Sequence, residues 1–160
     1  MHSDSLWLKV DAEPRSQGSM TAVYNRRLGV SRVRHANAPA LSIWRNTVAR
    51  NAIAEGATIW EGPIGMAMSF GIKEPKDIRH GYPKSPDLDK LVRAVLDALT
   101  GVCYANDNQV VWIEADKVWR NHTLIGVWQV EKQASANQES IWTQDAARMG
   151  AASRYRTRAR

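Results

Sequence analysis

The stretch PDLDKLVRAVLDALTGVCYANDNQVV, which covers residues 86–111, decides the fold. Its apolar side chains recur at the helical spacing i, i+3, i+7 and i+11, at Leu88, Leu91, Val95 and Leu99. Gly101 follows where such a helix would stop, because glycine accepts the backbone conformation that ends many helices. The pattern therefore predicts an amphipathic helix that begins near residue 88 and packs one stripe of side chains against a core.

Alternating patterns on both sides of this helix predict strands. Residues 6–10 alternate, and residues 64–70 place large side chains on one face and small ones on the other. The runs 109–119 and 123–131 also alternate, and the short link between them predicts an antiparallel hairpin. A further amphipathic helix is predicted over residues 39–54. We therefore expect an α+β fold: one small domain with a mixed or mainly antiparallel sheet and two principal helices.

Two polar stretches connect these elements. Residues 12–20, AEPRSQGSM, contain proline, glycine and serine, which predicts an irregular loop. Residues 72–86 contain three prolines and one glycine, so they predict a loop that leads the chain to the entrance of the second helix. Loops of this length often carry function.

The composition is that of a globular protein. Of the 160 residues, 44% are apolar and 24% are charged, which suits one folded domain and excludes fibrous or wholly disordered chains. No apolar run approaches the roughly 18 residues that cross a bilayer, and the amino terminus lacks the order of a signal peptide. We therefore expect a cytoplasmic protein with no membrane partner. The single cysteine, Cys103, is expected to be a buried thiol without a catalytic role.

The charge points to a polyanionic partner. The formal net charge is +6, the isoelectric point is near 9.8, and the excess is uneven. Residues 1–80 carry 11 basic and 7 acidic side chains, and residues 81–131 carry 5 and 7. Residues 132–160 carry 6 and 2 and lack a sustained apolar period. We therefore predict a domain over residues 1–131 followed by a basic tail over residues 132–160, which is either mobile or forms a marginal helix around Trp142 to Met149.

Arginines without nearby carboxylates suggest contacts with phosphate groups. The stretch from Pro14 to Arg50 contains no acidic residue. It contains seven arginines: Arg15, Arg26, Arg27, Arg32, Arg34, Arg45 and Arg50. A basic surface that is merely solvated explains the net charge equally well. The acidic centre of the chain must therefore decide between the two interpretations.

Three carboxylates, Asp87, Asp89 and Asp107, are candidates for a metal site. Side chains at i and i+2 share a side only in extended chain, so the first two converge only if Asp87 precedes the regular helix. The preceding Ser85-Pro86 favours that arrangement, and the helix dipole favours ionised carboxylates there. Asp107 can join them if the strand that follows it packs beside the helix entrance. The alternative is that the first pair caps the helix and that Asp107 is a turn residue.

The same stretch resembles the RusA-like Holliday junction resolvases, small metal-dependent endonucleases of bacteria that phages often carry. The resemblance joins D-L-D-x-L, a helical A-x-x-D-A-L-T, an aromatic residue and D-x-Q-V at the family spacing. The segments EPRSQGSM, NRRLGV and SIWRNTVARNA are also similar, so the likeness covers about residues 6–131. The tail lies outside it.

The resemblance implies roles for individual residues. Asp87, Asp89 and Asp107 fall on the family's metal-binding catalytic aspartates, which implies Mg²⁺, with Mn²⁺ as a substitute. An active-site lysine of the family falls on Arg93, which keeps the positive charge but favours phosphate stabilisation over proton transfer. Asn106 stands where relatives commonly have an aspartate, and Gln109 matches a family glutamine for which we expect an orienting role. The resemblance also implies a homodimer. The expected DNA contacts are Arg15, Arg26, Arg27, Arg32, Arg34 and Lys84.

These observations lead to one main hypothesis and two alternatives. The main hypothesis is a Mg²⁺-dependent, structure-selective DNA endonuclease that resolves four-way junctions by paired symmetric nicks in recombination and repair. A non-catalytic DNA-binding protein that retains the fold, with a site weakened at Arg93 and Asn106, is the first alternative. The second is a nuclease that acts on forks, flaps or other branched DNA. The resemblance implies a protein of the bacterial cell, encoded by the bacterium or by a phage.

Overall fold

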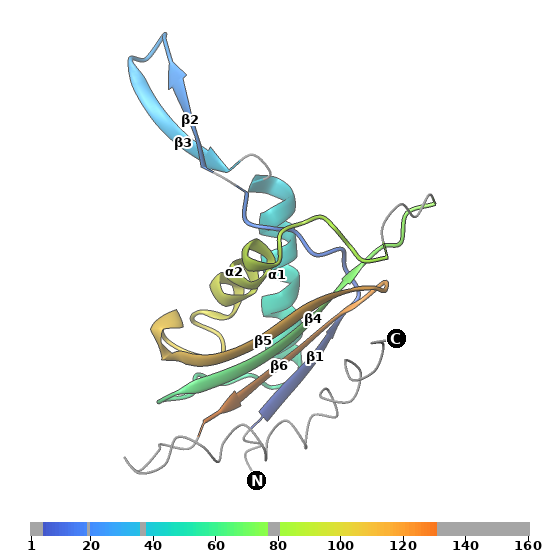
Figure 1. The fold of residues 1–160 in the computed structure, drawn as a ribbon. Coiled ribbons are helices and arrows are strands. Elements are labelled where there is room, and N and C mark those ends of the chain that lie inside the picture. Colours follow the sequence, from blue (N-terminus) through green and yellow to red (C-terminus); the bar gives the residue numbers. More distant parts are fainter. Residues whose placement is uncertain (1–4, 19, 36–37, 77–80, 131–160) are drawn as a thin grey trace.

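A four-stranded sheet forms one layer of the protein, and two helices form the other. The computed structural model describes residues 5–18, 20–35, 38–76 and 81–130. The sheet contains β1 (Ser5–Val10), β4 (Ile64–Ile72), β5 (Val110–Trp119) and β6 (Thr123–Gln129), in the order β1-β6-β4-β5. The helices α1 (Ala38–Ala54) and α2 (Leu88–Leu99) lie together on one face of this sheet (Figure 1).

The sheet is mixed. Strands β1 and β6 pair antiparallel, as do β6 and β4, whereas β4 and β5 run parallel. A parallel pair needs a crossover connection, and α2 lies in the segment that supplies it. The expected α+β fold with two helices and a mixed sheet is therefore confirmed. The proposed tail, residues 132–160, lies outside the described residues.

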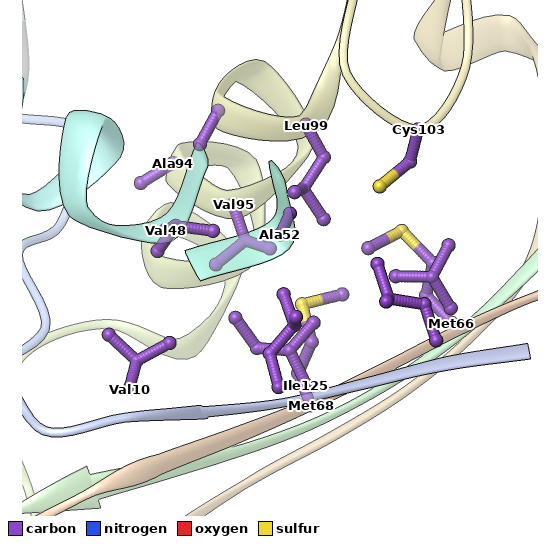
Figure 2. Close-up of a cluster of buried hydrophobic side chains, with 14 of the residues drawn as sticks. Val10, Val48, Ala52, Met66, Met68, Ala94, Val95, Leu99, Cys103 and Ile125 are labelled. Atoms are coloured by element: carbon purple, nitrogen blue, oxygen red, sulfur yellow. The ribbon is translucent and has the colours of Figure 1, made fainter. Parts of the chain in front are cut away.

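The core lies between the sheet and the helices. Strand β4 contributes its large side chains, which are fully or almost fully buried, at Ile64, Met66, Met68 and Phe70. Helix α2 contributes the predicted stripe, and α1 packs Trp44 and Val48 against the same cluster (Figure 2). Cys103 is buried there, and burial raises the pKa of its thiol to about 11. The periodicity of α2 and β4 therefore predicted the core correctly. The stripe of α1 did so at Leu41, Trp44 and Val48 but not at Ile53, which is exposed.

The predicted hairpin of β5 and β6 is wrong, because β4 lies between these two strands. Both faces of β4 are largely buried, so this strand needs a hydrogen-bonded neighbour on each side. The link between β5 and β6 therefore crosses the end of β4. There the Arg120 N–H donates to the Ile72 carbonyl at 3.0 Å, and the Gly71 N–H donates to the Thr123 hydroxyl at 3.3 Å.

A second small sheet stands apart from the domain. Strands β2 (Met20–Asn25) and β3 (Val30–His35) pair only with each other and form a hairpin that projects beyond α1 (Figure 1). The Asn25 side chain shapes its tip by accepting hydrogen bonds from the N–H groups of Arg27 and Leu28. Gly29 completes the turn with a φ of +63°. The sequence analysis missed this hairpin, although Asn25 and Gly29 between two alternating runs are turn signals.

Gly71 is predicted to be essential for the crossing. A Cβ atom at this position would lie 2.0 Å from the His122 carbonyl oxygen, a backbone atom that cannot swing away. We expect Gly71→Ala to lower the free energy of unfolding by about 3 kcal/mol, near the upper end for overpacking. Urea denaturation measures this, with Gly81→Ala as the control because a Cβ there meets nothing within 4 Å. Equal stability of the two variants would contradict the crossing.

Candidate active site

Asp87 lies at the N-cap of α2, but its side chain does not cap the helix. Its backbone is extended, with φ −64° and ψ 134°, and no capping hydrogen bond is made by its side chain. Instead the carboxylate pairs with the Lys90 ammonium one turn later, at 2.6 Å. Asp89 follows in the first turn and is exposed. The structure therefore does not support the capping role that was the alternative for Asp87.

The surroundings of Asp87 keep its carboxylate ionised. The hydrogen bond from Lys90, then the charge of Lys90, holds the pKa of this exposed carboxyl below its ordinary value, with a smaller contribution from Lys117. The same hydrogen bond raises the pKa of Lys90. Any stability that the Asp87–Lys90 pair contributes is present at a pH above the ordinary pKa of aspartate. It is lost as the pH falls through the lowered pKa of Asp87. At neutral pH the α2 entrance therefore presents ionised oxygens.

Lys117 of β5 fixes the backbone that leads into α2. Its ammonium donates to the Pro86 carbonyl at 2.7 Å and to the Lys84 carbonyl at 3.2 Å. The sequence analysis missed this role. A signal existed, because strand alternation puts Lys117 on the same face as Ala115, which packs against the core on the helix side. A lysine on that face needs acceptors, and the carbonyls before α2 supply them.

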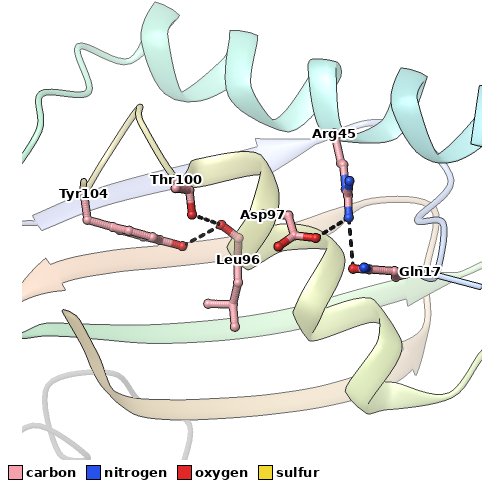
Figure 3. A network of polar contacts seen from close by, with 6 residues as sticks. All are labelled: Gln17, Arg45, Leu96, Asp97, Thr100 and Tyr104. Atoms are coloured by element: carbon pink, nitrogen blue, oxygen red, sulfur yellow. Dashed lines mark hydrogen bonds and ion pairs between the residues drawn. The ribbon is translucent and has the colours of Figure 1, made fainter. Parts of the chain in front are cut away.

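The segment before the hairpin is tied to α2 by a polar network (Figure 3). The Gln17 N–H donates to the Lys90 carbonyl at 3.0 Å, and the Gln17 side chain accepts a hydrogen bond from Arg45 at 2.9 Å. Arg45 also forms an ion pair with Asp97. Arg45 of α1 therefore links Gln17 to α2, so its guanidinium is engaged within the protein, whereas the sequence placed it among the arginines suggested to contact phosphate.

Arg93 lies one turn beyond Asp89 on the same helix. Its side chain is exposed and forms no ion pair with any other residue that the structure describes. Residues i and i+4 are neighbours on a helix surface, so the guanidinium can reach an anion held beside Asp89. The geometry is consistent with the phosphate-stabilising role expected of this residue.

Asp107 lies in a short 3₁₀ turn, Asp107–Gln109, which Gln109 organises. The Gln109 amide oxygen accepts hydrogen bonds from the N–H groups of Ala105 and Asn106, at 2.9 and 3.1 Å. Its amide nitrogen donates to the carbonyls of Trp60 and Gly62, both at 3.0 Å. Asn106 completes a capping box by accepting from the Asn108 N–H. Gln109 therefore has an identifiable orienting function: it fixes the turn that carries Asp107.

Helix α2 and strand β5 run in opposite directions. Near the end of β5, Lys117 contacts the carbonyl of Pro86 at the start of α2. Before β5 begins, the Tyr104 hydroxyl donates to the Leu96 carbonyl near the end of α2, at 2.9 Å. The strand from residue 110 to 117 spans about 23 Å at about 3.3 Å per residue. The turn before β5 therefore lies at the far end of α2 from its entrance.

The three candidate aspartates consequently do not meet within one chain. Asp87 and Asp89 share the entrance of α2, whereas Asp107 lies near its other end. Within the described residues, no group of three His, Cys, Asp or Glu side chains is placed to hold a metal ion. From the sequence, Asp107 was expected to join the other two aspartates if the strand after it packed beside the helix entrance. In the structure, only the end of β5 that is far from Asp107 lies beside this entrance.

The candidate DNA contacts fall into three groups. Arg15 and Lys84 are exposed on the segments before the hairpin and before α2, and Arg15 pairs with Glu13 at 2.6 Å. Arg26 and Arg27 are exposed at the hairpin tip. Arg32 and Arg34 occupy alternate positions of β3, and their side chains lie outside the described ones. The hairpin therefore holds four of the six candidates.

Comparison with protein families shows to which family the chain belongs. The model of the family described as endodeoxyribonuclease RusA matches residues 18–128, more than half of the chain. The chain belongs to the RusA endodeoxyribonuclease family. The match includes the hairpin, both helices and the candidate aspartates, so membership of the RusA family confirms the resemblance. It also supports a nuclease that acts on DNA. No curated protein matches the chain.

The described part of this RusA-family chain contains no helix that is long and apolar enough to cross a membrane.

The pairing at the entrance of α2 gives a test of the site's electrostatics. We expect Lys90→Met to raise the pKa of Asp87 toward its ordinary value, because the variant removes the hydrogen bond and the charge that lower it. An NMR titration of the Asp87 carboxyl carbon measures this. Lys84→Met is the matched control, since only the backbone carbonyl of Lys84 takes part in the local contacts. Equal shifts in both variants would rule out the specific pairing.

Proposed function

We propose that the protein is a metal-dependent, structure-selective endonuclease that resolves four-way DNA junctions. Family membership supports the endonuclease activity. The observation that carries the finer proposal is the pair of exposed carboxylates at the α2 entrance, of which Asp87 has a lowered pKa. Ionised, exposed oxygens suit a hard divalent cation. Cationic side chains of Arg15, Lys84 and Arg93 are available on the adjoining segments.

The proposed metal ligands are Asp87, Asp89 and Asp107, with Mg²⁺ as the cation and Mn²⁺ as a substitute. Their oxygens fit such an ion in kind, and Gln109 supports the fit because it holds the Asp107 turn rigidly. Bound Mg²⁺ would polarise a scissile phosphate and lower the pKa of a coordinated water. Arg93 would then contact the phosphate oxygens on which negative charge develops. Lys117 would keep the α2 entrance in place during this reaction.

One chain alone does not unite these ligands, so we propose that a two-fold dimer does. In a two-fold arrangement each contact occurs twice, and Asp107 of either protomer can face the Asp87 and Asp89 pair of its partner. Two sites would form together, one for each of two symmetric nicks. The distance between Asp107, near the end of α2, and the Asp87 and Asp89 pair at its start supports this assignment.

The β2–β3 hairpin is proposed to select branched DNA. It projects from the domain and presents Arg26, Arg27 and Leu28 at its exposed tip. Arginine forks bind phosphates, and an apolar side chain beside them can enter a gap between unstacked bases. A projecting arm gains contacts where DNA strands diverge and fewer along a continuous duplex. Resolution of four-way junctions is therefore favoured here over cutting of linear DNA.

The reaction is tested with Asp89→Asn. We expect this variant to nick a labelled four-way junction at least about 100-fold more slowly in Mg²⁺, because a ligand charge is lost from the site. Junction binding should persist, since the arginines are unchanged. Glu55→Gln, which neutralises an exposed carboxylate beyond α1, is the matched control and should nick normally. Binding by the wild-type protein without nicks in Mg²⁺ or Mn²⁺ would instead favour the non-catalytic alternative.

Sharing of ligands between protomers is tested by mixing inactive variants. Asp89→Asn and Asp107→Asn should each be inactive alone. When the two are unfolded together and refolded, mixed dimers should regain nicking, because one of their two shared sites then has all three aspartates. About half of a random mixture consists of such dimers, each with one intact site, so we expect roughly a quarter of the wild-type rate. If each site belonged to a single chain, mixing would restore nothing.

A further inference from the structure

The face of the sheet opposite the helices carries three tryptophans. Strand pairing aligns Trp128 of β6 with Gly65 of β4, and Gly65 with Trp112 of β5. In the next row Trp7 of β1 aligns with Gly126 of β6. Aligned residues share one face of a sheet, and these positions alternate with the core residues. The three tryptophans therefore lie on the face of the sheet opposite the core residues. Figure 1 shows both helices on the core side.

Two glycines let the indoles lie against the sheet. A Cβ atom at Gly65 would come within 2.5 Å of the Trp128 ring, and one at Gly126 within 2.6 Å of the Trp7 ring. The rings of Trp112 and Trp128 pack with their centroids 5.2 Å apart. The rings of Trp128 and Trp7 lie over glycines, and the Trp112 ring is tilted by 55° to that of Trp128. We call the three indoles together the tryptophan platform. This shape suits the packing of another apolar segment.

The platform leaves apolar surface exposed. Trp7 is 54% exposed and Leu124, its neighbour on the same face, is 37% exposed. Among the described elements, both helices pack on the other side. Apolar patches of this kind on a sheet commonly mark a surface that another segment covers.

Carboxylates gather at the β5 edge of this face, while Lys9, paired with Asp11, stands at the β1 edge and Arg120 donates to the Ser69 hydroxyl between them. Glu114 and Asp116 of β5 align with Ala67 and Ser69, which place them on the tryptophan side. One carboxylate oxygen of Asp116, Oδ1, is buried and has no hydrogen-bond partner among the described residues. A buried carboxylate oxygen without a donor is unfavourable. The β5 edge of the face, where Glu114 and Asp116 stand, therefore suits a segment that brings a cationic side chain beside apolar ones.

The chain itself continues with such a segment. Strand β6 ends at Gln129, directly after Trp128, and residues 131–160 follow. Residues 132–160 carry six basic and two acidic side chains. Trp142, Ala146 and Met149 stand at the spacing i, i+4, i+7, and Arg148 lies beside them. A segment tethered at the edge of the platform has a high effective concentration there, so even a modest contact is favoured over a free partner.

We propose that residues 141–149 dock on the tryptophan platform. The apolar side chains of the segment cover Trp7 and Leu124, and Arg148 supplies a donor near Asp116. The predicted mobile tail would then contain an anchored part, with only the arginine-rich end beyond residue 150 free for other contacts.

Hydrogen exchange of the full-length protein tests this docking. In the wild type, we expect amides of residues 141–149 to exchange at least about tenfold more slowly than their intrinsic rates, because docking protects them. The double variant Trp7→Ser, Leu124→Ser should lose this protection. Ile53→Ser with Ile59→Ser is the matched control, since both isoleucines are exposed away from the platform. It should keep the protection.

A second variant keeps the test decisive if the first fails to fold. Trp142→Ser changes the segment and leaves the domain intact, so it should abolish the protection and make the platform indoles more accessible to acrylamide. Intrinsic exchange rates throughout residues 141–149 of the wild type would overturn the proposal. So would a halved molar mass of the Trp7→Ser, Leu124→Ser protein in sedimentation, because a second copy would then cover the platform. Protection that appears only when junction DNA is added would also overturn it.

Discussion

The structure depends on the packing of α2 along β5 in the opposite direction. Lys117 holds the start of the helix through the carbonyls of Lys84 and Pro86, and Tyr104 holds its end through the carbonyl of Leu96. Between these two points the apolar stripe of α2 fills the space above the sheet. The direction of the chain through the crossover therefore determines where every polar residue of the candidate site can lie.

The opposite directions of α2 and β5 separate the candidate carboxylates, and different contacts hold each group in place. Asp87 and Asp89 stand where the helix dipole and neighbouring lysines stabilise negative charge. Asp107 stands on a turn whose backbone is held by the side chain of Gln109. Like charges kept apart do not repel each other in the free chain. The cost of bringing three carboxylates together would then arise only on assembly, when a cation is present to neutralise them.

Sequence patterns predicted what local periodicity controls. The stripe from Leu88 to Leu99 and the alternation of β4 gave both elements and the core between them, because burial on one face leaves a regular trace. Strand order left no such trace. The short link between β5 and β6 is typical of a hairpin, and only the burial of β4 on both faces explains why these strands are separated. The resemblance suggested candidate site residues but not their positions, since spacing along a chain does not give the direction of packing.

Gly65, Gly71 and Gly126 show how one compositional feature has several consequences. The sequence predicted only that β4 has one face of large side chains and one face of small ones. In the structure, the absence of a Cβ atom at Gly71 leaves room for the backbone of the β5–β6 link, and its absence at Gly65 leaves room for the indole of Trp128. Gly126 does the same for Trp7 on the neighbouring strand. The side of the sheet without helices is therefore closely built rather than simply solvated. A surface in which glycines make room for aromatic rings suits packing against a further segment, because the rings then offer a broad apolar contact.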